Sequence, residues 1–156
     1  MRRVVVTGVG LVSSLGTGVE KTWEALLKGE TGIKLIESFD TEDLAVKMAG
    51  VVDDFNPEDF GIDKKELKKL ARFSQFGIVA SKMALDDSGL IIDENNAERI
   101  GVIVSSGIGG LDVFEEQHIN LVDKGAKRVS AFTIPAMIAN MSSGNISIYL
   151  GAKGPN

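Results

Sequence analysis

The 156-residue sequence contains no cysteine, one histidine and three prolines. Without cysteine, these residues form no disulfide, no thiolate metal site and no cysteine nucleophile. His118 lies in a helical pattern with no identifiable acid or nucleophile nearby, so we expect a surface or packing role for it. Ser105 and Ser106 lack the Gly-x-Ser-x-Gly pattern of a nucleophile elbow. Paired acids such as Glu115 and Glu116 lack metal-ligand spacing, so the residues alone predict neither a complete catalytic site nor a metal site.

Long hydrophobic runs are also missing. The longest apolar stretch, residues 132–150, is interrupted by several Asn and Ser residues, which argues against a membrane span. The apolar run after Arg2 and Arg3 is too short for a signal peptide, so we expect a cytoplasmic protein. A net charge of −5 argues against general nucleic-acid binding. The 44% apolar and 25% charged residues are typical of a folded globular domain.

Glycine, in contrast, is abundant, with 18 residues, and the most informative glycines follow a β-branched run. Residues 99–110 read RIGVIVSSGIGG. Residues 100–104 are typical of a strand buried on both faces. The loop after them brings small residues and Ile108 to the end of the strand where α/β proteins usually bind ligands. A tight strand-to-helix turn with Ile108 in the core is the alternative interpretation.

A second glycine motif follows the expected strand over residues 4–6. Gly8 and Gly10 are similar to the start of a dinucleotide fingerprint, but Ser13 stands where the third glycine belongs. A pyrophosphate site needs a helix that opens at the turn, and helical sequence begins only near Thr17. Nucleotide binding is therefore a remote alternative.

Periodicity and glycine stops predict helices over residues 19–28, 74–88, 111–124 and 136–150, and a short strand over 47–52. Four apolar residues of the third helix are expected to face inward, namely Leu111, Phe114, Leu121 and Val122. Asp63 and Glu66 suggest a capping box for a further helix that starts at Lys64. The order of elements predicts an α/β fold whose sheet lacks strands. The chain is therefore expected to be part of a larger domain, with no boundary inside residues 1–156.

The clearest surface feature is a cluster of cations in this further helix. Five basic residues fall within an arc of ~140° on a helix, namely Lys64, Lys65, Lys68, Lys69 and Arg72. Lys127 and Arg128 form a second pair. A solvated helix face is one interpretation. The other is a docking surface for an acidic protein, because clustered like charges repel one another unless an anionic partner compensates them.

Five blocks of the sequence together resemble the β-ketoacyl-ACP synthases of the thiolase-like fold, particularly their synthase II branch. The blocks are RRVVVTGVGLVSSLG, TWEALLKGETGI, IGVIVSSGIGGL, VSAFTIPAMIANM and YLGAKGPN, in the family's order. The resemblance implies the N-terminal half of a layered α-β-α fold with a mixed sheet, incomplete in this chain. It also implies a homodimer, with the 130s segment at the dimer contact.

The resemblance further implies fatty-acid elongation by decarboxylative Claisen condensation, in which acyl-ACP and malonyl-ACP give 3-oxoacyl-ACP and CO2. No cofactor is implied, because the phosphopantetheine of acyl carrier protein carries the substrates. The family's cysteine and histidine pair are expected beyond Asn156, so these 156 residues alone should be inactive. By resemblance, the acyl pocket includes Ile108, Phe132, Thr133, Ile134 and Met137. The residues that match the family's carrier-protein docking patch are Lys65, Lys68, Lys69, Lys127 and Arg128.

Two related functions stay open. One is a polyketide ketosynthase, and the other is a non-catalytic partner subunit that shapes a chain-length pocket. A cysteine in the strand expected after Asn156, or a substitute at its position, would separate a catalytic subunit from a non-catalytic one.

Overall fold

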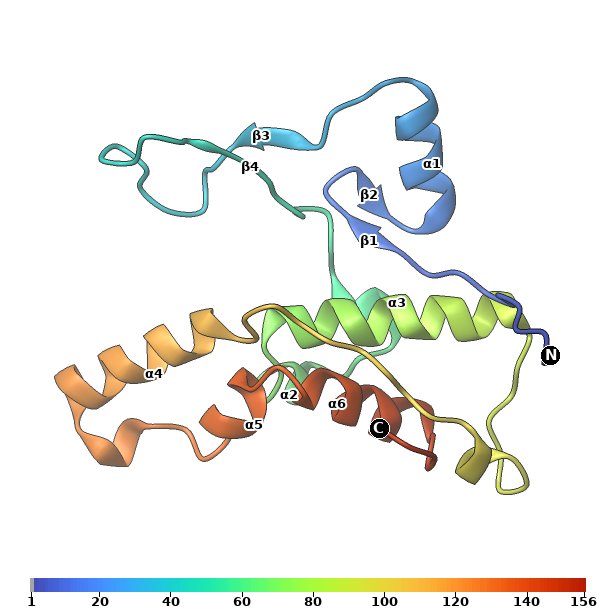
Figure 1. Ribbon diagram of the computed structural model, residues 1–156. Helices are drawn as coiled ribbons and strands as arrows, with labels where there is room; N and C mark the ends of the chain where they lie inside the picture. Colours follow the sequence, from blue (N-terminus) through green and yellow to red (C-terminus); the bar gives the residue numbers. More distant parts are fainter. Residues whose placement is uncertain (1) are drawn as a thin grey trace.

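The computed structural model describes residues 2–156 and shows a strand-containing lobe above a layer of helices (Figure 1). The lobe contains β1 (Val12–Ser13), β2 (Gly16–Thr17), α1 (Val19–Leu27), β3 (Ile33–Leu35) and β4 (Met48–Gly50). The strands form two antiparallel hairpins, β1 with β2 and β3 with β4. The helices outside the lobe are α2 (Lys64–Leu67), α3 (Arg72–Ser88), α4 (Leu111–Lys124), α5 (Thr133–Met137) and α6 (Met141–Leu150). Three short 3-10 helices accompany them: η1 (Pro57–Phe60), η2 (Ala97–Arg99) and η3 (Ala126–Arg128).

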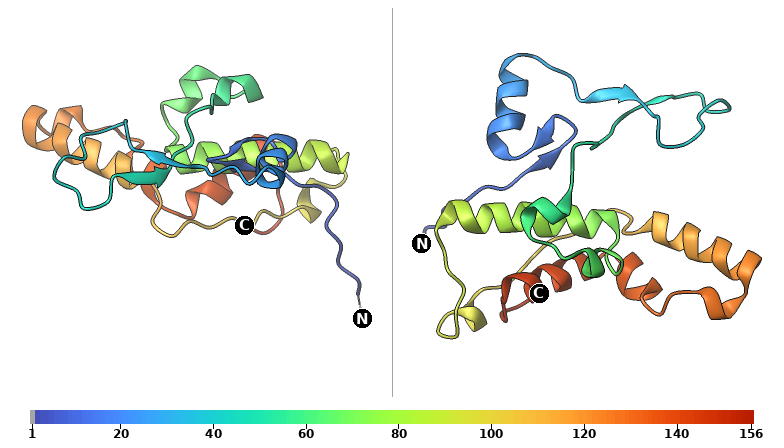
Figure 2. Two further views of the ribbon diagram at one scale, coloured as in Figure 1. Left: turned by 90° about the horizontal axis from the view of Figure 1, so that it is seen from above. Right: turned by 180° about the vertical axis from the view of Figure 1, so that it is seen from behind.

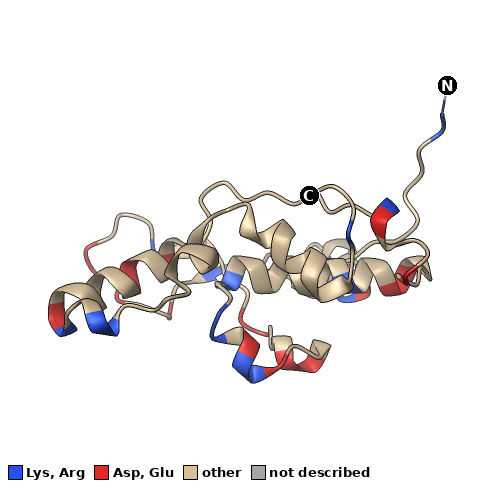
Figure 3. Cartoon of the chain, turned by 90° about the horizontal axis from the view of Figure 1, so that it is seen from below, with Lys and Arg blue, Asp and Glu red and all other residues tan. Residues whose placement is uncertain are grey.

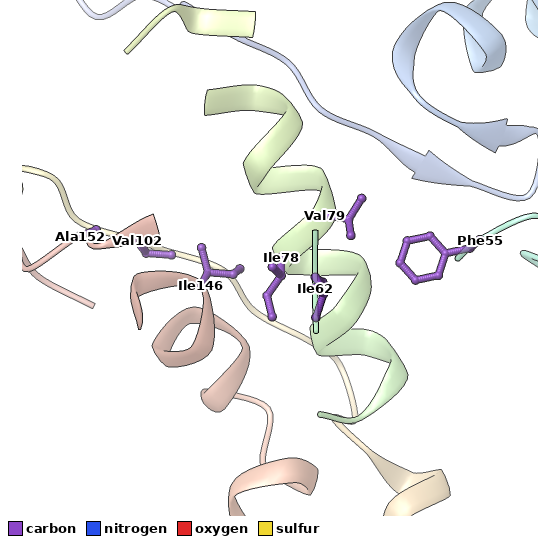
Figure 4. Close-up of a cluster of buried hydrophobic side chains, with 7 residues drawn as sticks. All are labelled: Phe55, Ile62, Ile78, Val79, Val102, Ile146 and Ala152. Atoms are coloured by element: carbon purple, nitrogen blue, oxygen red, sulfur yellow. The ribbon is translucent and has the colours of Figure 1, made fainter. Parts of the chain in front are cut away.

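The hydrophobic core lies between α3 and α6, which run side by side (Figure 1). Ile78 and Val79 of α3 are 0% exposed, and Ile146 of α6 is 1% exposed. Figure 4 shows Ile146 between Ile78 and Val102, with Phe55 at the far side of α3. Full burial of one such aliphatic side chain contributes roughly 1.5–3 kcal/mol. The facing sides of α3 and α6 therefore lie at the centre of the buried cluster, which also includes Phe55, Ile62, Val102 and Ala152.

Several predicted element boundaries are confirmed. The helices expected over residues 19–28, 74–88 and 111–124 correspond to α1, α3 and α4, and the strand expected over residues 47–52 contains β4. Gly89 ends α3 with φ +65, a left-handed conformation that suits glycine. No helix formed by residues 2–156 combines the length and the apolar composition that crossing a membrane requires.

The two strands expected over residues 4–6 and 100–104 are extended segments that belong to no sheet within residues 2–156. Val102 donates its backbone N–H to the Pro155 carbonyl oxygen at 2.9 Å, and Gly154 donates to the Ile100 carbonyl oxygen at 3.0 Å. Residues 100–102 and 154–155 therefore run side by side in the same direction. Burial on both faces is wrong for the described chain, because Ile103 is 95% exposed. A strand acquires two covered faces only from neighbouring strands and helices.

Two expected helices are interrupted. The expected helix over residues 136–150 is replaced by α5 and α6, which are separated at Ile138, whose ψ of 137 is extended. The basic segment after Asp63 is not one continuous helix either, because α2 ends at Leu67 and Ala71 is extended before α3. In Figure 2, α2 and η1 stand out to one side of the helical layer.

The prediction that α4 turns apolar residues inward is wrong for the described chain. Leu111, Phe114, Leu121 and Val122 are 46% to 68% exposed, and α4 has no buried residue. The physical reason is visible in Figure 1, where α4 projects from the end of the layer and packs mainly on α5 and η3.

Candidate functional site

The cations near α2 differ in the side-chain contacts that they make. Lys65 and Lys68 are exposed and form no ion pair within residues 2–156. Lys69 is partly buried, and its Nζ donates to Glu66 Oε1 at 2.7 Å. The same Nζ lies 5.6 Å from the centroid of the Phe132 ring. Lys69 is therefore already engaged by two side chains, whereas Lys65 and Lys68 are available to a partner.

The Asp63 part of the predicted capping box is present. Asp63 Oδ1 accepts the backbone N–H of Lys65 at 2.7 Å and so caps α2. Glu66 pairs with Lys69 instead of reaching back to Asp63, which leaves the box half formed. Burial raises the pKa of the nearby Tyr149 phenol above its ordinary value, and the negative charges of Glu66 and Asp63 add to this shift.

Arg72 does not belong to the cationic face that the sequence predicts. Its Nη2 donates to the Val52 carbonyl oxygen at 2.6 Å. Its guanidinium carbon lies 5.0 Å from the Phe76 ring centroid and 5.6 Å from that of Phe55. The contacts with Val52 and Phe55 tie Arg72 to the chain between β4 and η1. The five-cation face on one helix is therefore wrong, since α2 ends before Arg72.

The second basic pair, Lys127 and Arg128, lies in η3 beyond the C-terminal end of α4. Both residues are exposed. Figure 3 shows these cations as a group separate from those around α2. The predicted docking residues therefore form two basic groups rather than one continuous patch.

A groove of about 460 Å³ lies between the start of α3, α4 and α5. Its lining includes Lys68, Gln75, Asp112, Glu116, Phe132 and Thr133. Gln117 Oε1 accepts the backbone N–H of Ser130 at 2.8 Å, which fixes the loop before α5 to α4. Sequence reasoning missed Gln117, because its partner is distant in the chain and no local pattern connects them.

The glycine loop before α4, residues 107–110, packs against α5. Gly110 donates its N–H to the Met137 carbonyl oxygen at 2.8 Å. Gly109 has φ +85, and a Cβ there would overlap the same carbonyl oxygen. Gly109 also donates its N–H to Ser106 Oγ at 3.0 Å. Glycine is thus required at Gly109 both by the backbone conformation and by the close approach of α5.

The five predicted acyl-pocket residues do not line one cavity of the described chain. Phe132 and Thr133 line the groove beside Lys68. Ile108 is 75% exposed and Ile134 is 59% exposed. Met137 meets the glycine loop through its backbone. Their role in an acyl pocket stays a prediction.

The remaining candidates have structural explanations. The His118 ring is exposed and stacks on Phe114, with the ring centroids 6.3 Å apart. The Cβ positions of Gly8 and Gly10 are occupied by the Ala84 and Ala80 carbonyl oxygens of α3. A phosphate therefore has no room to approach that turn, which removes the observation that suggested nucleotide binding.

Three comparisons with known proteins identify the family. Residues 1–156 match the model of the β-ketoacyl synthase N-terminal domain, so the chain belongs to the β-ketoacyl synthase family. The chain is 50% identical over 155 residues to 3-oxoacyl-acyl-carrier-protein synthase 2 of Vibrio harveyi. It is 51% identical over 155 residues to the protein of that name from Staphylococcus aureus strain COL. Each match covers 99% of this chain but only 37% of the relative's length.

Solved structures show the same fold. The ishigamide ketosynthase/chain length factor superposes with a TM-score of 0.80 at 32% identity, covering 99% of this chain and 38% of that one. A ketosynthase in complex with its type II PKS acyl-carrier protein superposes with a TM-score of 0.76 at 26% identity. The match covers 96% of this chain and 39% of that one. The predicted thiolase-like fold is thus confirmed as a partial domain. This chain spans less than half the length of these structures. The segments expected as strands, residues 4–6 and 100–104, therefore stay unpaired here.

Proposed function

We propose that the gene product, at its natural length, joins acyl-ACP with malonyl-ACP by decarboxylative Claisen condensation, the reaction that the family resemblance implies. The observation that carries this proposal is about 50% identity across 155 residues to two proteins named 3-oxoacyl-acyl-carrier-protein synthase 2. In this reaction a thiolate holds the acyl group, and aligned donors stabilise the developing oxyanion. By resemblance, the thiolate and the two histidines come from sequence beyond Asn156, and no cofactor is needed.

The described residues would contribute the docking surface for acyl carrier protein. Lys65, Lys68, Lys127 and Arg128 are exposed cations in a chain of net charge −5, so they attract an acidic partner to defined places. Each exposed ion pair contributes only about 0.2–1 kcal/mol. The two basic groups would therefore raise the association rate more than they slow dissociation. A solved ketosynthase complex with its acyl-carrier protein supports this type of partner.

The exposed apolar residues of α4 and α5 support a dimer contact. Phe114, Ile119 and Ile134 are each at least half exposed, and an uncovered group of this kind indicates an interaction site. By resemblance, a second copy of the protein would cover them and form the acyl pocket together with Ile108. We place this homodimer in the cytoplasm, because the proposed substrates are carried on acyl carrier protein.

The docking proposal is tested by charge reversal in the natural-length gene product. Replacing Lys65, Lys68 and Lys69 together with Glu should slow association with acyl carrier protein at least about tenfold at low salt and flatten its salt dependence. The matched control reverses three exposed lysines elsewhere, Lys28, Lys82 and Lys153. Stopped-flow association at several ionic strengths is the measurement. Equal rates for the two triple variants would contradict docking at α2.

A non-catalytic chain-length subunit is the second candidate, because one structural neighbour is a ketosynthase/chain length factor. Such a subunit would produce 3-oxoacyl-ACP only together with a separate ketosynthase. A purified catalytic homodimer would do so alone. The requirement for a second subunit therefore distinguishes the two functions.

A further inference from the structure

We infer that the contact between Lys69 and Phe132 transmits carrier-protein docking to the glycine loop that carries Ile108. This inference rests on the proposed docking function. Of the five predicted docking cations, only Lys69 has its side chain engaged by other side chains of residues 2–156. Its Nζ bonds to Glu66 Oε1 at 2.7 Å and lies 5.6 Å from the Phe132 ring centroid.

Lys69 therefore has two alternative sets of partners. In the free protein its ammonium group pairs with Glu66 and lies over the Phe132 ring. A carboxylate of a docked acidic protein competes with Glu66 for the same ammonium group, and a move toward that carboxylate takes the cation away from the ring. The loss of a cation–π contact of this exposure changes an equilibrium about two- to fivefold. Docking would thus remove a contact of Phe132, a residue that also lines the groove beside Lys68.

The path from Phe132 to the glycine loop consists of backbone contacts. Phe132 immediately precedes α5, and its carbonyl oxygen accepts the Ala136 N–H at 2.9 Å. Met137 follows Ala136 and is the last residue of α5, and its carbonyl oxygen accepts the Gly110 N–H at 2.8 Å. A Cβ at Gly110 would also lie 3.0 Å from the Ala136 carbonyl oxygen, so the loop sits tightly on α5. A shift of the first turn of α5 therefore reaches the loop that holds Ile108.

Lys65 offers a matched comparison. It lies on α2, one turn before Lys69, and carries the same charge, but no ring or carboxylate of residues 2–156 engages its side chain. Replacing Lys65 should weaken docking without altering the effect of a bound carrier on the Gly110 amide. Replacing Lys69 or Phe132 should remove the effect at Gly110 even when the carrier protein is bound.

The test measures hydrogen exchange of the Gly110 amide in the natural-length gene product, with and without saturating acyl carrier protein. Wild type and Lys65→Met should show about two- to fivefold faster exchange at Gly110 when the carrier is bound. Lys69→Met and Phe132→Leu should show no change. Exchange at Ile78, in the core, reports that each variant is folded.

The outcomes separate this inference from the docking proposal. Carrier binding to wild type with unchanged exchange at Gly110 would overturn the inference and leave docking standing. A retained effect at Gly110 in Lys69→Met would overturn it as well. Failure of the carrier to bind wild type would remove both the docking function and the inference.

Discussion

The helix pair α3 and α6 and the single helix α4 differ in how fully this chain covers them. Ile78 of α3 and Ile146 of α6 are no more than 1% exposed, whereas every residue of α4 is partly or fully open to solvent. Both regions are amphipathic or apolar in sequence, so the difference lies in what packs against them. Residues 2–156 already bury Ile78 and Ile146 where α3 and α6 face each other, whereas the surface of α4 is available for a partner or for further chain.

The largest expected effect tests this difference directly. Ile146→Ala should reduce the free energy of unfolding of the 156-residue chain by about 2–5 kcal/mol, because it leaves a cavity against α3. Ile119→Ala on α4, where the side chain is half exposed, should cost less than about 0.5 kcal/mol. Urea unfolding measures both values. Equal losses would contradict the assignment of the core.

Gly109→Ala should have the next largest effect, about 1–3 kcal/mol, because the new Cβ is strained at φ +85 and overlaps the Met137 carbonyl oxygen. Gly125 is a control for backbone strain alone, since its φ is +81 but nothing lies near its Cβ position. Thermal unfolding compares the two alanine variants. A larger loss for Gly125→Ala would show that the glycine loop is not seated on α5.

Ile108→Phe tests whether the uncovered loop reaches an acyl pocket. Ile108 is 75% exposed in this chain, so the larger ring should leave the fold intact. If the loop lines a pocket, kcat/KM of the natural-length gene product for long acyl-ACP relative to short acyl-ACP should fall about tenfold. Kinetics with acyl-ACP substrates of increasing length measure this ratio. An unchanged profile would remove Ile108 from the pocket.

The smallest expected effect concerns the ion pair between Lys21 of α1 and Asp54. The hydrogen bond and charge of Lys21 hold the pKa of the Asp54 carboxyl below its ordinary value. A lowered folded-state pKa stabilises the protein above the unfolded pKa of about 4, and this stabilisation is lost as the pH falls below it. Because both side chains are largely exposed, Lys21→Met should cost well under 1 kcal/mol at pH 7. Unfolding at pH 7 and pH 3 should show a smaller difference between wild type and variant at pH 3 than at pH 7.

Local signals were sufficient for most helices. Gly89 and Gly125 end α3 and α4 where the sequence indicated, and the Asp63 cap fixes the start of α2. The interruption before Arg72 had no such signal, because it depends on Arg72 reaching the Val52 carbonyl oxygen and two phenylalanine rings. The paired strands expected at residues 4–6 and 100–104 depend on neighbours that this chain does not supply.

The candidate site was predictable in its charges but not in its contacts. The cations and Ile108 were identified from residue type and from family resemblance. The pairing of Lys69 with Glu66 follows from helical spacing and could have been anticipated. The position of Phe132 under Lys69, and of α5 under the glycine loop, arises only when distant segments fold together.

One assay tests most directly whether the natural-length gene product is the proposed condensing enzyme. The natural-length protein, purified alone, is incubated with acyl-ACP and malonyl-ACP, and the acyl group on the carrier is followed by mass spectrometry. We expect 3-oxoacyl-ACP whose chain is two carbons longer, with release of CO2. Unchanged acyl-ACP under conditions where the carrier binds would contradict it.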